Sequence, residues 1–149
     1  MKKLFASTPV WLIRILVGWV FLLEGILKFM EPGDLGVGRF AAIGIPRPHI
    51  TAIFVGLIEI VCGAAVLADF CTSLASLLLL IDISVAIAST KVPILLGHGY
   101  WRFALPKLKH YGLFSMLHEA RTDISMVLGL IFLLMAVALR GSSGKRSSP

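Results

Sequence analysis

Five charged residues lie within or at the end of long apolar stretches of this chain: Arg14, Glu24, Lys28, Glu59 and Asp82. A charge at the centre of a bilayer costs roughly 2.5–3.5 kcal/mol on insertion scales. Residues of this kind persist because they pair with one another, line a wet cavity or take part in chemistry. The question posed by the sequence is which of these three roles they have.

Glu59 and Asp82 are the strongest candidates for chemistry, because neither has a nearby cation in its own apolar stretch. A carboxyl group that is alone at mid-membrane depth keeps its proton at neutral pH. In that state it can transfer the proton or donate a hydrogen bond to a carbonyl group. Both residues lie about ten positions from the start of their apolar stretch, so helices would place them at one depth.

The charges on the first apolar stretch share a helical face with glycines. At 100° per residue a single stripe carries Arg14, Gly18, Phe21, Gly25 and Lys28. Glu24 lies beside this stripe, four residues before Lys28, which is the favourable order for an ion pair. Small residues allow helices to approach closely in membranes. We therefore expect this face to point into a helical bundle.

A purely structural account of the same residues is also open. Charges can fix the register of packed helices, with Glu24 paired to Lys28 and Arg14 paired to Glu59 or Asp82. The functional account makes Glu59, Asp82, Glu24, Lys28 and Arg14 a ligand or proton site.

The composition is that of a membrane protein. The chain has 149 residues, of which 58% are hydrophobic and 15% charged, and its mean hydropathy is +0.94. Soluble domains have about 45–50% apolar and about 25% charged residues. Four stretches are long and apolar enough to cross a bilayer: residues 9–29, 49–68, 72–90 and 122–139. Because backbone groups in lipid must bond within their own segment, these stretches are helices.

The sequence therefore predicts an all-α integral membrane four-helix bundle. Residues 1–140 form this one domain, and residues 141–149 form a disordered polar tail. Residues 30–48 should fold back onto the mouth of the bundle, since Phe40, Ile43 and Ile45 do not suit a free linker. Residues 91–121 are rich in aromatic and basic side chains, which is typical of the headgroup region. Residues 105–120 are expected to form a short interfacial helix there.

The net charge of +6 does not indicate nucleic acid as a partner. The basic residues lie in tails and loops that flank the spans, where they set topology and meet anionic lipid. The lipid bilayer is thus the expected partner, and the start of the chain, Met1-Lys2-Lys3, favours cytoplasmic termini.

No metal site is predicted. Histidines and acids occur between the third and fourth spans, but without an HxxxH or ExxH pattern: His98, His110, His118, Glu119 and Asp123. The two cysteines, Cys62 and Cys71, are read as small packing residues, although a bridge across the short turn between them is geometrically conceivable.

The pattern of these residues resembles the DoxX family of small four-helix membrane proteins. The resemblance rests on one ordered set of positions over about residues 11–90: Arg14-x3-Gly18-x2-Phe21-x3-Gly25-x2-Lys28, then Phe40, Gly44-Ile45-Pro46 and Glu59-x3-Gly63. It implies a multi-pass protein of a bacterial or archaeal cytoplasmic membrane. Relatives are linked to membrane oxidoreductase assemblies, including thiosulfate–quinone oxidoreductase and a thiol-oxidative-stress complex.

Three functions remain open at this point. The first is an accessory subunit of a membrane redox complex, with no covalently bound cofactor, that anchors other redox subunits or lines a quinone or proton site. The second is a small proton-coupled carrier, which an oligomer would suit. The third is a structural or assembly protein in which the charges serve only packing.

Overall fold

The computed structural model describes residues 10–144 and places side chains for residues 10–139. The described chain is helical throughout its regular structure. Its elements are α2 (Val10–Met30), α3 (Val37–Ile43), α4 (Pro48–Leu67), α5 (Thr72–Leu96), α6 (Leu113–Glu119) and α7 (Arg121–Gly144). Four of these helices have the length and apolar composition to cross a membrane: Val10–Met30, Pro48–Leu67, Thr72–Leu96 and Arg121–Leu139. The predicted all-α, four-helix membrane bundle is confirmed.

Two helices extend beyond the predicted spans. α5 was expected to end at residue 90 but continues through Pro93 to Leu96, where Gly97 adopts a left-handed conformation with φ 73°. The Gly97 N–H donates to the Pro93 carbonyl at 2.9 Å and closes the last turn. α7 continues to Gly144, so its backbone is helical in the first part of the expected polar tail. Residues 145–149 of that tail lie outside the described residues.

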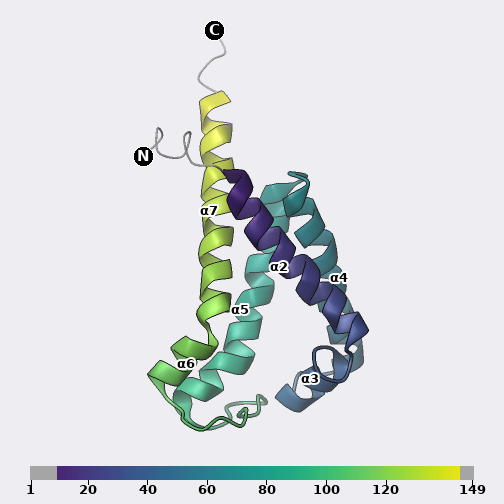
Figure 1. The fold of residues 1–149 in the computed structure, drawn as a ribbon, viewed down its shortest axis with the longest axis vertical. Coiled ribbons are helices and arrows are strands. Elements are labelled where there is room, and N and C mark those ends of the chain that lie inside the picture. Colours follow the sequence, from purple (N-terminus) through teal and green to yellow (C-terminus); the bar gives the residue numbers. More distant parts are fainter. Residues whose placement is uncertain (1–9, 145–149) are drawn as a thin grey trace.

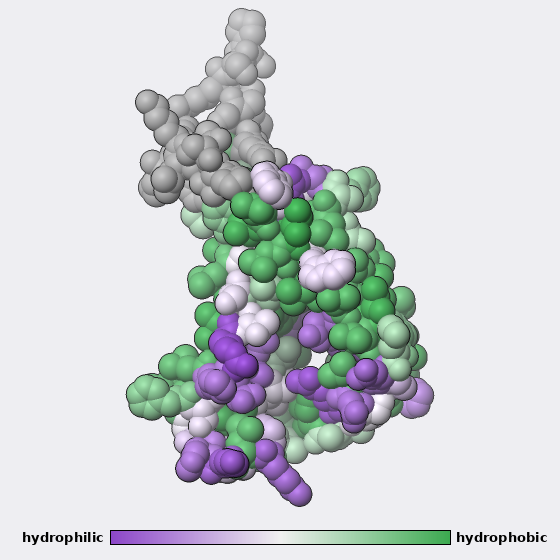
Figure 2. All heavy atoms as spheres, viewed as in Figure 1, coloured by the Kyte–Doolittle hydropathy of each residue, from purple (hydrophilic) through white to green (hydrophobic). Residues whose placement is uncertain are grey.

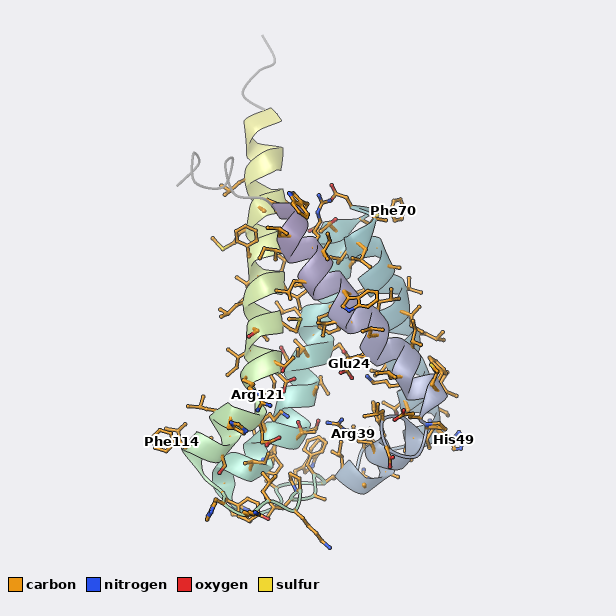
Figure 3. All side chains as sticks on the ribbon, viewed as in Figure 1. Glu24, Arg39, His49, Phe70, Phe114 and Arg121 are labelled. Carbon is orange, nitrogen blue, oxygen red and sulfur yellow. The ribbon has the colours of Figure 1, made fainter. Side chains whose placement is uncertain are left out.

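The expected interfacial helix is shorter than its predicted range of 105–120. Only Leu113–Glu119 is helical, as α6, and Gly112 precedes it with φ 108°. Residues 97–112 instead form a loop that is organised by Tyr100, whose hydroxyl donates to the Ala88 carbonyl at 3.2 Å. The Phe114 ring on α6 points away from the bundle and is 87% exposed (Figure 3), as an interfacial anchor would be.

Helices α2 and α4 pack with their backbones almost in contact. A Cβ atom at Gly25 would lie 2.8 Å from the Gly56 carbonyl oxygen, and one at Gly63 would lie 2.7 Å from the Leu22 nitrogen. Gly18 meets the Gly63 carbonyl in the same way, at 2.8 Å. The glycine stripe predicted to face a neighbouring helix therefore faces α4.

The bundle consists of two arms that join at one end. The first arm is α2 with α4, and the second is α5 with α7 (Figure 1). The arms meet near the α4–α5 turn, which we call the hairpin side, and separate towards the opposite end, the loop side, where α3 and α6 lie (Figure 1). Most of the fully buried apolar side chains belong to the joined half: Val17, Val66, Leu79, Leu130 and Leu133. Ser89 and Pro93 of α5 are also fully buried, nearer the loop side.

The outer faces of all four spans carry large apolar side chains that are exposed in the isolated chain. Water would disfavour such a surface, whereas lipid accepts it. The exposed residues include Trp11, Ile15 and Trp19 on α2, Phe54, Leu57 and Val61 on α4, Leu74, Leu77 and Ile81 on α5, and Leu128, Ile131 and Met135 on α7.

The close α2–α4 contact gives a first prediction. Gly25→Ala should lower the thermal stability of the detergent-solubilised protein, because the new methyl group collides with backbone atoms of α4. Overpacking of this kind costs about 1–3 kcal/mol. Gly33→Ala is the control, since a Cβ atom there meets nothing within 4 Å. Equal unfolding temperatures for the two variants would show that the helices are not packed this closely.

Candidate functional site

A cavity of about 300 Å³ lies between the two arms on the loop side. It gathers charged side chains from five elements: Glu24 and Lys28 of α2, Arg39 of α3, Glu59 of α4, Asp82 and Lys91 of α5, and Asp123 of α7. Figure 2 shows an opening through the molecule at this level, with hydrophilic side chains on both sides of it and apolar surface above. Glu24 and Arg39 lie beside the space between the arms in Figure 3.

Lys28 and Glu59 form a buried ion pair across the α2–α4 contact. The Lys28 Nζ and Glu59 Oε2 atoms are 2.5 Å apart, and the two side chains are only 10% and 7% exposed. The approach of α2 to α4 at Gly25 and Gly56 brings the two chains into reach. In a low-dielectric setting such a pair needs close geometry to offset the cost of removing both charges from water.

Glu24 competes weakly for the same lysine. Its carboxylate oxygen is 4.0 Å from Lys28 Nζ, and its side chain is 52% exposed. The Lys28 ammonium group therefore interacts mainly with Glu59, and Glu24 lies at the edge of the cavity.

Asp82 reaches the same place from the second arm. Its carboxyl group lines the cavity and is close enough to Lys28 and Glu59 to interact with them electrostatically. Lys28, Glu59 and Asp82, which we call the charge cluster, thus place one cation and two carboxyl groups at the inner wall of the cavity.

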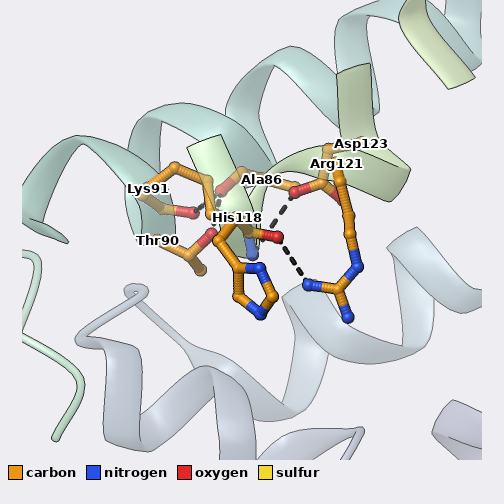
Figure 4. A network of polar contacts seen from close by, with 7 residues as sticks. Ala86, Thr90, Lys91, His118, Arg121 and Asp123 are labelled. Atoms are coloured by element: carbon orange, nitrogen blue, oxygen red, sulfur yellow. Dashed lines mark hydrogen bonds and ion pairs between the residues drawn. The ribbon is translucent and has the colours of Figure 1, made fainter. Parts of the chain in front are cut away.

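A second ion pair connects the helices of the other arm. Lys91 Nζ of α5 lies 3.3 Å from Asp123 Oδ2 of α7 (Figure 4). Next to it, Arg121 donates from its guanidinium group to the His118 carbonyl at 2.6 Å, which ties α6 to the start of α7. Both Lys91 and Asp123 line the cavity, so this ion pair forms part of its rim.

The loop side of the cavity is covered rather than open. Phe40, Ile43 and Ile45 line it from the segment that was expected to fold back onto the bundle. The Ala104 N–H donates to the Ile43 carbonyl at 2.8 Å, which links the loop after α5 to α3. Phe103 from that loop also lines the cavity.

Of the five residues singled out in the sequence, Glu24, Lys28, Glu59 and Asp82 line one cavity and Arg14 does not. Arg14 lies on the hairpin side, where it forms an ion pair with Asp69 instead of the expected Glu59 or Asp82. Asp69 also accepts a hydrogen bond from the Thr72 hydroxyl at 3.0 Å. Arg14 therefore connects the start of α2 to the α4–α5 turn.

Arg39 and Lys91 line the cavity but were read in the sequence as loop charges. Lys91 directly follows residue 90, where the third span was expected to end. The sequence therefore did not predict that Lys91 lies on a helix. Asp123 lies in the first turn of α7 and lines the cavity from there.

The cysteines and histidines do not join this cavity. Both cysteines are unpaired, Cys62 in the core and Cys71 exposed before α5. Within the part of the chain that the structure describes, no group of three or more His, Cys, Asp or Glu side chains is arranged to hold a metal ion.

The fold and the cavity define a small multi-pass integral membrane protein that encloses a charged site between its helices. The chain belongs to the DoxX family, whose model matches residues 10–92. It is similar to the Uncharacterized membrane protein Rv3486 of Mycobacterium tuberculosis (strain ATCC 25618 / H37Rv), with 48% identity over 136 residues that cover 91% of this chain and 79% of that protein. No solved structure gives a significant match.

The burial of the Lys28–Glu59 ion pair predicts a marked asymmetry between single and double substitutions. Lys28→Met should destabilise the protein by roughly 3 kcal/mol, because it leaves a buried acid without its cation. Lys28→Met combined with Glu59→Met should recover most of that loss, since two apolar side chains can fill the same space. Thermal unfolding in one detergent measures both variants.

Arg39→Met is the matched control for these variants. Arg39 lines the same cavity and forms no ion pair with another described residue. Its replacement should change stability little. If the double variant is less stable than Lys28→Met alone, the two side chains do not act as a pair.

Proposed function

We propose that this chain is an integral membrane subunit of a redox complex, in which the cavity binds a quinone and the charge cluster exchanges protons with it. The observation that carries the proposal is the position of two carboxyl groups and one ammonium group at the inner wall of a partly apolar cavity. A quinone head has two carbonyl oxygens on an apolar ring, which matches this combination of groups.

The chemistry assigned to the cluster is limited to hydrogen bonding and proton transfer. Reduction of a quinone to a quinol takes up two electrons and two protons. In this proposal the Lys28 ammonium group donates a hydrogen bond to one quinone oxygen, and Glu59 and Asp82 relay two protons from the aqueous phase to the two oxygens of the reduced quinone. The electrons come from a partner subunit that oxidises a thiol or another reduced sulfur compound, as the family resemblance suggests.

The loop side is the proposed docking face for that partner. It carries basic and aromatic side chains that are exposed in the isolated chain, including Arg102, Trp101 and Tyr111. We place the protein in the cytoplasmic membrane of a bacterium or archaeon, with both termini on the cytoplasmic side. The docking face then lies on the opposite side of that membrane.

Isosteric neutral variants test the site. Glu59→Gln and Asp82→Asn should insert and fold but should lower the affinity for menadiol, the reduced form of a quinone without a tail, by about tenfold, because a quinol hydroxyl donates a stronger hydrogen bond to a carboxylate than to an amide. Glu31→Gln and Asp34→Asn are the controls, because both acids are exposed and neither lines the cavity. Binding is measured by equilibrium dialysis of protein in lipid nanodiscs. Unchanged affinity in both site variants would refute the assignment.

Purification from native membranes tests the complex. We expect a redox-active subunit and an extractable quinone to copurify with the chain, identified by mass spectrometry. Recovery of self-oligomers alone, without a redox partner or a quinone, would contradict the proposal. The proton-coupled carrier is the alternative, and it predicts solute-driven proton flux in proteoliposomes that contain only this chain.

A further inference from the structure

The cavity has two rims of opposite character. The rim between α2 and α7 carries Glu24, Thr122 and Asp123, and Glu24 is half exposed there. The rim between α4 and α5 carries Val55, Val85 and Ala86, and Val85 is 55% exposed although it also lines the cavity. The cavity thus has a polar side and an apolar side.

The apolar rim lies at the depth of the hydrocarbon core. Val55 is seven residues from the start of α4 at Pro48, and Val85 is eleven residues from the end of α5 at Leu96. With a rise of about 1.5 Å per residue, both are roughly 10 Å or more from the loop end of their helix. Their exposed surfaces therefore meet lipid tails and not water.

The two other routes out of the cavity are unfavourable for a hydrocarbon chain. On the loop side the way is bridged by the hydrogen bond from the Ala104 N–H to the Ile43 carbonyl. On the α2–α7 rim an alkyl chain would cover Glu24 and Asp123 and remove them from polar surroundings, which is costly without a compensating bond.

We propose that the ligand of the cavity is an isoprenoid quinone whose head lies against the charge cluster and whose tail leaves between α4 and α5, across Val55, Val85 and Ala86. This proposal rests on the proposed function and adds the route and the ligand class. The head loses its water to Lys28, Glu59 and Asp82, while the tail stays in the bilayer. The ligand never has to cross the loop side.

A pair of tryptophan variants on α5 tests the route. Val85→Trp fills the apolar rim, whereas Ile81→Trp lies one turn away, at an equally exposed position that does not line the cavity. Two probes are compared in nanodiscs: menadione, which has no tail, and its homologue with a short isoprenoid tail. Val85→Trp should weaken binding of the tailed quinone by about tenfold or more relative to binding of menadione. Ile81→Trp should change neither.

The outcomes distinguish a wrong binding site from a wrong route for the tail. If the unsubstituted protein binds neither probe, the proposed function fails and the route fails with it. If it binds both and Val85→Trp does not distinguish them, the site stands and the route is wrong.

A second experiment uses the unsubstituted chain and so does not depend on the folding of a variant. A quinone with a photoreactive diazirine at the start of its tail should label peptides of α4 and α5 that contain Val55, Val85 or Ala86. Labelling confined to α2 and α7 would place the tail at the polar rim and overturn the proposal.

Discussion

The structure depends on how a membrane-embedded chain accommodates charges that it cannot expose to hydrocarbon. The Lys28–Glu59 ion pair is the central solution, with both side chains nearly buried and 2.5 Å between the charged atoms. It forms only because α2 and α4 approach at glycines, so the glycine stripe and the ion pair depend on each other. Lys28 cannot be neutralised equally well by Glu24, which is 4.0 Å away and half exposed.

The tight packing of α2 against α4 also leaves a cavity between the two arms. α2 is held against α4 along its length, and it contacts α7 around Val17, where a Cβ atom at Gly129 would lie 2.6 Å from the Val17 side chain. The arms then separate, and the space between them becomes the cavity. Ion pairs connect the helices at both ends of the bundle: Arg14 with Asp69 on the hairpin side and Lys91 with Asp123 at the rim of the cavity. The charge cluster thus lies where two rigid arms face each other, and the second arm adds Asp82 to it.

Much of this architecture can be predicted from the sequence, and the reasons are physical. Long apolar stretches define the spans, and helical phase brings Lys28 and Glu24 to a face lined with glycine. Equal depth places Glu59 level with Asp82. The partner of Arg14 was not predictable in the same way, because Asp69 lies in a turn whose position depends on how α4 and α5 end. Lys91 was missed because α5 runs past Pro93, and the separation of the arms follows from glycine contacts that no local pattern reveals.

Infrared difference spectroscopy can detect whether Glu59 and Asp82 exchange protons with a bound quinone, as proposed. The spectrum is recorded on the protein in lipid while a bound quinone is reduced electrochemically. If they do, reduction of the quinone should produce a change in the carboxylic acid C=O stretching region, and this change should be lost or shifted in Glu59→Gln and Asp82→Asn. A quinone that is reduced in the cavity without any carboxylic acid signal, or with a signal that both variants retain, would contradict the proposal.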